Sequence, residues 1–234
     1  MGTIVAIGGG KETFEIDKYI ASLPGKTKPT VLIIPTASED NQGYIGLLSK
    51  IYQRNLKCKI KTLKIITKKM TEEEIREKIL SADIIYVGAG DTLKMLRAWR
   101  EFNIDRYLAQ AHENGVILSG LSAGAVCWFQ HAYSDSALHE SGKYAKIAGI
   151  GLIPAMMCPH YDERAEFDEF MKSETAAVAV ENNCAFIVKD GSFRIFKGIP
   201  SARAFLIKSA DGNIDKQELD NEEYLPLEGL FDRG

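Results

Sequence analysis

Apolar, strand-like runs alternate with amphipathic, helix-like runs through the first two thirds of the chain. The strand-like segments are Thr3–Ile7, Thr30–Ile34, Lys59–Leu63, Ile84–Val87 and Val116–Ser119. The helix-like segments between them are Glu12–Leu23, Gln42–Asn55, Thr71–Ser81, Thr92–Trp99 and Asp105–Asn114. Strands joined by helices at this spacing form right-handed βαβ units. The alternation therefore predicts an α/β fold, in which helices cover both faces of a mostly parallel sheet.

The pattern changes in the last third of the chain. Four short strand candidates follow one another there, separated by Asn, Gly and Pro: Ala176–Val180, Ala185–Val188, Phe193–Phe196 and Ala202–Lys208. We expect them to form short antiparallel hairpins on one edge of the sheet. The acidic segment Asp215–Glu223 is expected to be a solvated surface segment. Because no repeat or evident linker interrupts the chain, we expect a single domain over residues 1–234.

The composition excludes several classes of function. The chain has 234 residues, of which 45% are apolar and 26% charged, as in an ordinary globular protein. A net charge of −3 and a pI near 5.9 argue against a nucleic-acid-binding protein. No apolar run approaches the ~20 residues of a membrane-spanning helix, and no signal peptide is recognisable. We therefore expect a cytoplasmic protein.

Neither a metal nor a cofactor is indicated. The cysteines Cys58, Cys127, Cys158 and Cys184 are scattered without a Cys-x-x-Cys pair, so we expect reduced, mostly buried thiols. No cluster of His, Cys and Asp has the spacing of metal ligands. The segment Gly8–Gly10 matches a dinucleotide-binding fingerprint only in part. We interpret it as a loop that lines a crevice or as a plain turn.

The segment Gly120-Leu121-Ser122-Ala123-Gly124 has the form of a nucleophile elbow. A strand-like run precedes it and a helix-compatible run follows, so Ser122 would stand on a sharp strand-to-helix turn. The glycines let the backbone bend. The N–H groups at the start of the next helix would point toward the group that the serine attacks. The pattern favours hydrolase chemistry, although a small-residue turn before a buried helix also fits it.

Such a hydrolase needs a general base, for which the chain offers His112, His131, His139 and His160. His112 lies inside a helical pattern, and His131 and His139 flank a polar region. His160 instead follows Ile153–Pro159, a largely apolar segment with a proline at its end, which suits a fixed loop at the edge of the sheet. We therefore favour His160 as the base.

The order of these residues argues against a standard α/β-hydrolase. That class places its histidine late in the chain, after the acid, whereas no histidine follows His160 here. Such an order would have to use Asp135 and His160, which leaves little chain between Ser122 and His160 for further strands. A triad in the order Ser, His, acid stays open, with the acid drawn from the late strands.

Three motifs resemble the peptidase E family of serine peptidases, whose relatives include aspartyl dipeptidases and cyanophycinases. They are Gly-Ala-Gly-Asp-Thr at 88–92, Gly-Leu-Ser-Ala-Gly-Ala at 120–125 and Cys-Pro-His-Tyr at 158–161. The resemblance covers roughly residues 1–208. It implies a flavodoxin-like fold related to the class I glutamine amidotransferases, with Ser in place of Cys at the elbow.

The resemblance also implies roles for individual residues. Ser122 matches the nucleophile and His160 the general base. Glu181, at the end of a predicted strand, matches the acid that would orient the histidine. Asp135 is a rival acid, which we interpret as a turn cap in its Ser-Asp-Ser loop.

Two backbone N–H groups, those of Gly90 and Ala123, would form the oxyanion hole. Asp91 stands where peptidase E has Asn, so we expect its side chain to face away or to cap the helix that begins at Thr92. Arg164, which closely follows His160, is a candidate to bind the side-chain carboxylate of a substrate that begins with Asp.

The sequence therefore predicts a metal-independent serine peptidase that hydrolyses short peptides, as a dipeptidase or aminopeptidase-like enzyme, through a Ser-His-Glu triad and an acyl-enzyme. A requirement for N-terminal Asp stays open, because the elbow continues as Ala-Val-Cys-Trp-Phe, unlike that of the aspartyl dipeptidases. The alternatives are a small esterase or amidase with the same triad and a non-catalytic amidotransferase-like binding protein. Short peptides are the expected partners, without nucleic acid or membrane, and a homodimer is left open.

Overall fold

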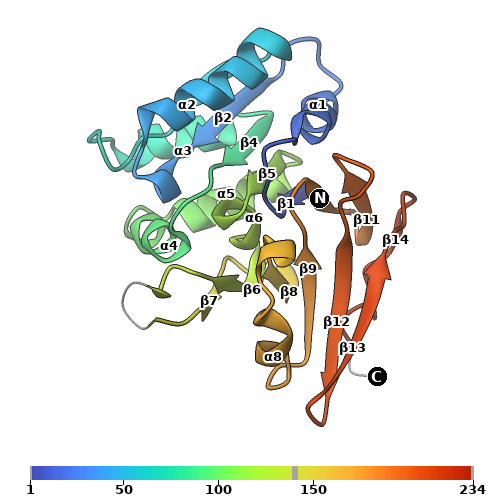
Figure 1. Cartoon of the computed structure of the whole chain (residues 1–234). Coiled ribbons are helices and arrows are strands. Elements are labelled where there is room, and N and C mark those ends of the chain that lie inside the picture. Colours follow the sequence, from blue (N-terminus) through green and yellow to red (C-terminus); the bar gives the residue numbers. More distant parts are fainter. Residues whose placement is uncertain (1, 139–141, 233–234) are drawn as a thin grey trace.

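The computed structural model describes residues 2–138 and 142–232 and contains two β-sheets (Figure 1). The first has eight strands in the order β14-β11-β10-β1-β5-β4-β2-β3. They span Leu225–Pro226 (β14), Ser192–Lys197 (β11), Cys184–Lys189 (β10), Thr3–Ile7 (β1), Ile117–Leu121 (β5), Ile84–Val87 (β4), Thr30–Ile34 (β2) and Lys59–Thr62 (β3). Strands β1, β5, β4, β2 and β3 pair in parallel, and β10, β11 and β14 extend the sheet antiparallel. The predicted mostly parallel sheet is confirmed.

A second sheet corrects the expectation that all the late strands lie on one edge of the first. Its six strands have the order β13-β12-β9-β8-β6-β7. They span Asn213–Leu219 (β13), Ala204–Ala210 (β12), Ala176–Val180 (β9), Ile153–Cys158 (β8), Phe129–Ser134 (β6) and Ala145–Ala148 (β7). Strands β10 and β11 lie on the edge of the first sheet as predicted, but β9 and β12 pair with each other in the second. The segment Asp215–Glu223 is mostly exposed, as expected, but begins within β13.

Helices cover both faces of the first sheet because successive strand residues point to opposite faces. Ile4 and Leu32 belong to one core cluster, while their neighbours Val5 and Ile33 belong to another. Helices α3, α4 and α5 contribute to the first cluster, and α1 and α2 to the second. These helices span Phe14–Ser22 (α1), Gln42–Ser49 (α2), Glu72–Leu80 (α3), Thr92–Glu101 (α4) and Ile104–Glu113 (α5). The predicted double coverage is confirmed.

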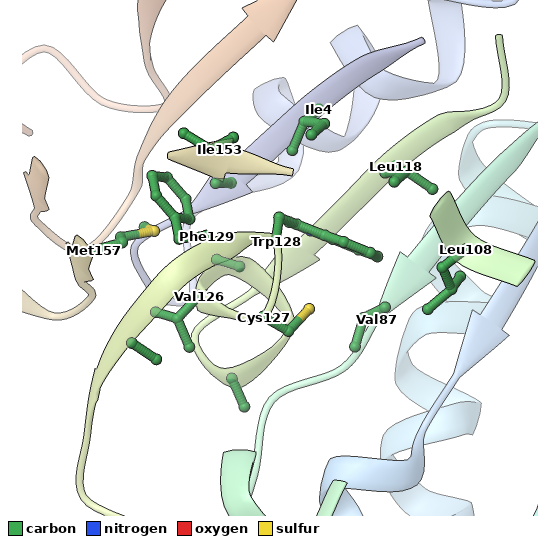
Figure 2. Packing of buried hydrophobic residues seen from close by; sticks show 14 of the residues in the cluster. Ile4, Val87, Leu108, Leu118, Val126, Cys127, Trp128, Phe129, Ile153 and Met157 are labelled. Carbon is green, nitrogen blue, oxygen red and sulfur yellow. The ribbon is translucent and has the colours of Figure 1, made fainter. Parts of the chain in front are cut away.

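The first core cluster continues from the first sheet into the second. Phe129 and Ile153, in strands of the second sheet, pack in it with Leu118 of β5. Figure 2 shows these side chains around Trp128, which follows the short helix α6 (Ala123–Val126) and is fully buried. Helix α6 contacts strands of both sheets. The opposite face of the second sheet carries a third cluster, to which helix α8 (Phe167–Met171) contributes.

Local sequence signals fix some helix ends well and others only partly. At the start of α3, the Thr71 hydroxyl accepts from the Glu74 N–H at 3.2 Å, and the Glu74 carboxylate accepts from the Thr71 N–H at 2.8 Å. This is the predicted capping box. The helix predicted over Gln42–Asn55 is α-helical only to Ser49 and continues as a π-helical turn, Lys50–Asn55.

Two further features concern the state of the cysteines and the presence of membrane-spanning helices. All four cysteines are free and buried, as predicted. No helix of the described segments combines the length and the apolar character that crossing a membrane requires.

Asp17 of α1 is a buried carboxyl group whose titration should be visible in the stability of the protein. It accepts from the Tyr52 hydroxyl at 2.8 Å and from the Thr13 hydroxyl at 3.1 Å. Burial raises its pKa from 3.8 to about 6 despite these bonds. Because the folded pKa lies above the unfolded one, the folded state favours the protonated form. The resulting stability is present below the unfolded pKa and is lost as the pH rises through about 6.

We therefore expect the wild type to lose about 3 kcal/mol relative to Asp17→Asn between pH 4 and pH 7. Urea unfolding of both proteins across this range measures the difference. Asp211→Asn, at an exposed hairpin tip, is the matched control and should parallel the wild type. Parallel stability curves for Asp17→Asn and the wild type would contradict the assignment.

Candidate active site

Ser122 stands on a sharp turn between β5 and α6. Its backbone has φ 57° and ψ −112°, a region that non-glycine residues rarely adopt. The Ser122 N–H donates to the Ile7 carbonyl of β1 at 3.0 Å. The Ser122 carbonyl accepts from the N–H groups of Ala125 at 2.9 Å and Val126 at 3.0 Å. This is the strand–turn–helix geometry expected of a nucleophile elbow.

Both glycines of the elbow are required by close backbone contacts. A Cβ on Gly120 would lie 2.2 Å from the Gly124 carbonyl oxygen, and a Cβ on Gly124 would lie 2.1 Å from that of Val87. Val87 ends β4, the strand that pairs with β5. A side chain at either glycine would therefore push helix α6 away from the sheet and displace Ser122.

His160 lies beside Ser122, with its Nε2 2.9 Å from the Ser122 Oγ. The chain reaches it from β8 through Pro159, and the His160 N–H donates to the Gly8 carbonyl at 3.0 Å. The backbone of His160 is left-handed, with φ 51° and ψ 40°. This conformation turns the imidazole back toward the first sheet. The structure thus brings together the predicted nucleophile and the predicted base.

The other ring nitrogen of His160 pairs with an asparagine that sequence reasoning missed. His160 Nδ1 lies 2.8 Å from the Oδ1 of Asn182. The Asn182 Nδ2 donates to Asp162 Oδ2 at 3.0 Å and to Glu163 Oε1 at 2.7 Å. Since carboxylates accept and only the amide nitrogen donates, the two carboxylates fix which end of the amide faces His160.

The orientation of this amide decides the tautomer of the histidine. Asn182 presents its oxygen to His160, so Nδ1 must carry the proton and donate it. Nε2 is then unprotonated and accepts from the Ser122 hydroxyl. A histidine in this state can take the proton of Ser122 when the serine attacks.

Glu181, the predicted acid, has a different partner. Its carboxylate is buried and accepts from the Arg203 side chain at 2.8 Å and 3.3 Å and from the Arg203 N–H at 3.0 Å. Strand β9 ends at Val180, and the residue that reaches His160 is Asn182, in the turn that follows Glu181. The expected Ser-His-Glu contact is therefore replaced by a Ser-His-Asn contact.

Neither the rival acid Asp135 nor the candidate substrate-binding residue Arg164 contacts the Ser122–His160 pair. Arg164 is only 4% exposed, and its guanidinium donates to the Tyr133 carbonyl at 2.8 Å. It lies over the rings of Tyr133 and Tyr144 and 3.8 Å from the Asp135 carboxylate. Arg164 thus binds its own chain, and Asp135 pairs with Arg164 instead of His160. Among the candidates for the base, His139 lies outside the described residues.

The glycine loop after β1 forms the floor beneath the His160–Asn182 pair. A Cβ on Gly9 would lie 2.2 Å from the His160 ring and 2.4 Å from Asn182 Oδ1. A Cβ on Gly10 would lie 2.0 Å from Asn183 Oδ1. The sequence left open whether this loop lines a crevice or is a plain turn. The signal that could have placed it beside the site is that its glycines follow β1, the strand that pairs with β5.

The backbone N–H groups predicted for the oxyanion hole are unoccupied. Neither the N–H of Ala123 nor that of Gly90 has a hydrogen-bond partner within residues 2–138 and 142–232. Ala123 follows Ser122 directly, and Gly90 lies in the loop that follows β4. The Asp91 carboxylate accepts from the Lys94 N–H at 3.0 Å, and so caps α4 as expected.

An open cleft lies beside these residues. His160, Asn182 and Leu121 line it together with the loop residues Lys11 and Glu12. No group of three or more His, Cys, Asp or Glu side chains in the described part of the chain is arranged to hold a metal ion. Burial raises the pKa of the Cys127 and Cys158 thiols well above their usual value, so these thiols stay protonated. Ser122, which is half-buried, is the candidate nucleophile of the site.

A serine on a strained strand-to-helix turn, hydrogen-bonded to a histidine, is the arrangement of serine hydrolases. A family model of peptidase family S51 matches residues 4–196, so the chain belongs to that family. The expected membership of the peptidase E family is confirmed. The chain is therefore a serine peptidase, which is a hydrolase.

Proteins with a similar sequence or structure are also named as peptidases. The chain is 30% identical over 226 residues to the uncharacterized peptidase YgaJ of Bacillus subtilis strain 168, covering 92% of this chain and 95% of that protein. A peptidase from an acI-B1 actinobacterium has a similar structure, with a TM-score of 0.70 and 18% identity over 97% of each chain. A putative peptidase E protein from Listeria monocytogenes EGD-e gives a TM-score of 0.69 and 21% identity over 84% of this chain and 98% of its own. At these identities the two structures confirm the fold.

We expect substitution by Ala to have opposite effects at Gly9, which lies against His160, and at Gly46, which does not. Gly9→Ala should lower peptide turnover by about 10²-fold, because its methyl group would displace His160 and Asn182. Gly46→Ala in α2 meets nothing within 4 Å. It should keep full activity and add about 0.5–1 kcal/mol of stability. Turnover and urea unfolding of both variants provide the test, and full activity in Gly9→Ala would contradict the role of the loop.

The contacts of Glu181 predict an effect on stability without loss of catalysis. Glu181→Gln should cost about 1–3 kcal/mol, because it weakens the hydrogen bonds of a buried carboxylate to Arg203. Its turnover should stay within about threefold of the wild type, since the side chain does not contact His160. Asp135→Asn, at an exposed residue, should change neither quantity. A collapse of turnover in Glu181→Gln would return the role of the acid to Glu181.

Proposed function

We propose that this peptidase hydrolyses short peptides through an acyl-enzyme on Ser122, with His160 as general base and Asn182 as the residue that orients it. The single observation that carries the proposal is the 2.9 Å contact between Ser122 Oγ and His160 Nε2, at a serine held in a strained backbone conformation. Strain of this kind costs about 1–3 kcal/mol and persists where a site requires it.

In the first half of the reaction, Ser122 Oγ attacks the peptide carbonyl carbon while His160 Nε2 takes the hydroxyl proton. The imidazolium that forms keeps its Nδ1 proton, which Asn182 Oδ1 accepts. Negative charge develops on the former carbonyl oxygen. The free N–H groups of Ala123 and Gly90 are the proposed donors to it, and each such donor contributes about 3 kcal/mol.

In the second half, the proton on His160 Nε2 passes to the leaving amine as the peptide C–N bond breaks. Water then attacks the ester of Ser122, and His160 takes a proton from that water. Return of this proton to Ser122 Oγ releases the acid product and restores the starting state. Each step uses the same tautomer, which is why the amide orientation of Asn182 matters throughout.

The contacts of Arg164 bear on the choice of peptide. Its guanidinium is buried and donates to a backbone carbonyl, so it does not support a requirement for N-terminal Asp. The cleft beside His160 is open and carries both a cation, Lys11, and an anion, Glu12. We therefore propose a broad dipeptidase or aminopeptidase-like activity on short peptides.

The test is mass-spectrometric hydrolysis of a mixture of dipeptides and tripeptides. Ser122→Ala and His160→Ala should each lower turnover by about 10⁴-fold or more and leave the fold intact. Ser173→Ala and His131→Ala, outside the site, are the matched controls and should behave as wild type. Full activity in either site variant would contradict the proposed roles.

Two further measurements, of acyl-ester turnover and of ligand binding, separate the alternative functions. Turnover of acyl esters without any cleavage of peptides would identify a small esterase or amidase. Ligand binding without turnover of either class of substrate would identify a non-catalytic binding protein.

A further inference from the structure

We propose that Asp162 and Glu163 are positioning residues that provide, through the amide of Asn182, the negative charge that the acid of a Ser-His-Asp triad provides directly. The inference rests on the function proposed above. It extends the site from three residues to a relay of five: Ser122, His160, Asn182, Asp162 and Glu163.

The contacts of Asp162 show that it binds Asn182 at two points. Its Oδ1 accepts from the backbone N–H of Asn182 at 2.8 Å, and its Oδ2 accepts from the side-chain Nδ2 at 3.0 Å. Glu163 Oε1 accepts from the same Nδ2 at 2.7 Å. Both hydrogens of the amide nitrogen therefore have carboxylate acceptors, and the amide has one orientation left toward His160.

The two carboxylates belong to the same turn as the histidine that they serve. His160 is followed by the 3₁₀ turn Tyr161–Glu163 (η3), and the Glu163 N–H donates to the His160 carbonyl at 2.8 Å. The turn therefore carries the base, while Asn182, from the connection between β9 and β10, fills the gap between the imidazole and the carboxylates. Backbone and side-chain bonds form a closed ring that holds the imidazole.

A neutral amide alone would stabilise an imidazolium less than a carboxylate does. Hydrogen bonds to charged groups are about twice as strong as those between neutral groups, and successive bonds polarise one another. Two carboxylates on the Asn182 nitrogen shift electron density toward its oxygen, which faces His160 Nδ1. The charge of Asp162 and Glu163 thus acts on the imidazolium that forms when Ser122 loses its proton.

A purely structural role for these carboxylates makes a different prediction. Asp162 and Glu163 are both exposed, so their removal should leave the core intact. If they only held the turn, conservative amide substitutions would alter substrate binding and catalysis alike, or neither. A relay predicts a loss confined to kcat, because its effect appears only when the imidazolium forms.

The first test replaces both carboxylates by amides, in Asp162→Asn/Glu163→Gln. The amide at position 162 has one oxygen for two N–H donors of Asn182, and neither new side chain carries a negative charge. This favours rotation of the Asn182 amide, which presents a donor to His160 Nδ1. The wrong tautomer follows, and kcat should fall by about 10²–10⁴-fold with KM changed less than threefold. Asp211→Asn/Glu169→Gln, at two exposed carboxylates outside the site, is the charge-matched control and should behave as wild type.

The second test is rescue by moving the charge. Adding Asn182→Asp to the double variant places a carboxylate directly on His160 Nδ1, held by the new amide donors. It should recover at least tenfold in kcat over the double variant. Asn182→Asp alone, which brings three carboxylates together, should be less active than this triple variant. A side chain with a merely structural role would not reverse its effect in this way.

A spectroscopic readout supports the kinetics without depending on turnover. In the wild type, the Nδ1 proton of His160 should give a low-field NMR signal, assigned by its loss in His160→Ala. The signal should move upfield or disappear in the double variant and return in the triple one. An unchanged kcat in the double variant, or no recovery in the triple variant, would overturn the relay. Loss of peptide cleavage in Ser122→Ala alongside either result would leave the proposed function standing.

Discussion

Hydrogen bonds from three directions hold Ser122 in a backbone conformation that L-residues rarely adopt. Its N–H donates to Ile7 of β1, its carbonyl accepts from two N–H groups of α6, and its hydroxyl is bonded to His160. The strain is sustained because the surrounding structure leaves no alternative: Gly120 and Gly124 let the helix approach the sheet, and Trp128 anchors the chain beyond it. The neighbouring strands, the glycine loop after β1 and the turn of His160 are all placed around this one residue.

The first sheet was predictable because its signal is local. Its parallel strands are short apolar runs separated by amphipathic helices, and their bounds agree with the prediction to within two residues. The second sheet was not, because a strand pattern does not name the partner of the strand. Ala176–Val180 and Cys184–Lys189 look alike in sequence, but the turn between them takes the chain from one sheet to the other.

The active site was predictable as far as the reacting groups and no further. Ser122 and His160 are recognisable because glycines and prolines mark their turns. Asn182 was missed because a neutral amide stands beside a carboxylate, Glu181, that fits the expected chemistry of a triad. Both residues follow the end of β9, where the chain turns, and sequence alone does not say which of the two side chains faces His160. The prediction for Arg164 was wrong for a similar reason. Arg164 is close to His160 in sequence, but its guanidinium binds a carbonyl of its own chain.

The serine comes from the first sheet, whereas the histidine comes from the second, and the asparagine comes from the turn that joins them. No one sheet contains the machinery for cleaving a peptide bond. His160 reaches the hydroxyl of Ser122 only where the two sheets pack together, and helix α6 itself contacts strands of both. The fold in this way makes the Ser122–His160 contact depend on the packing of one sheet against the other.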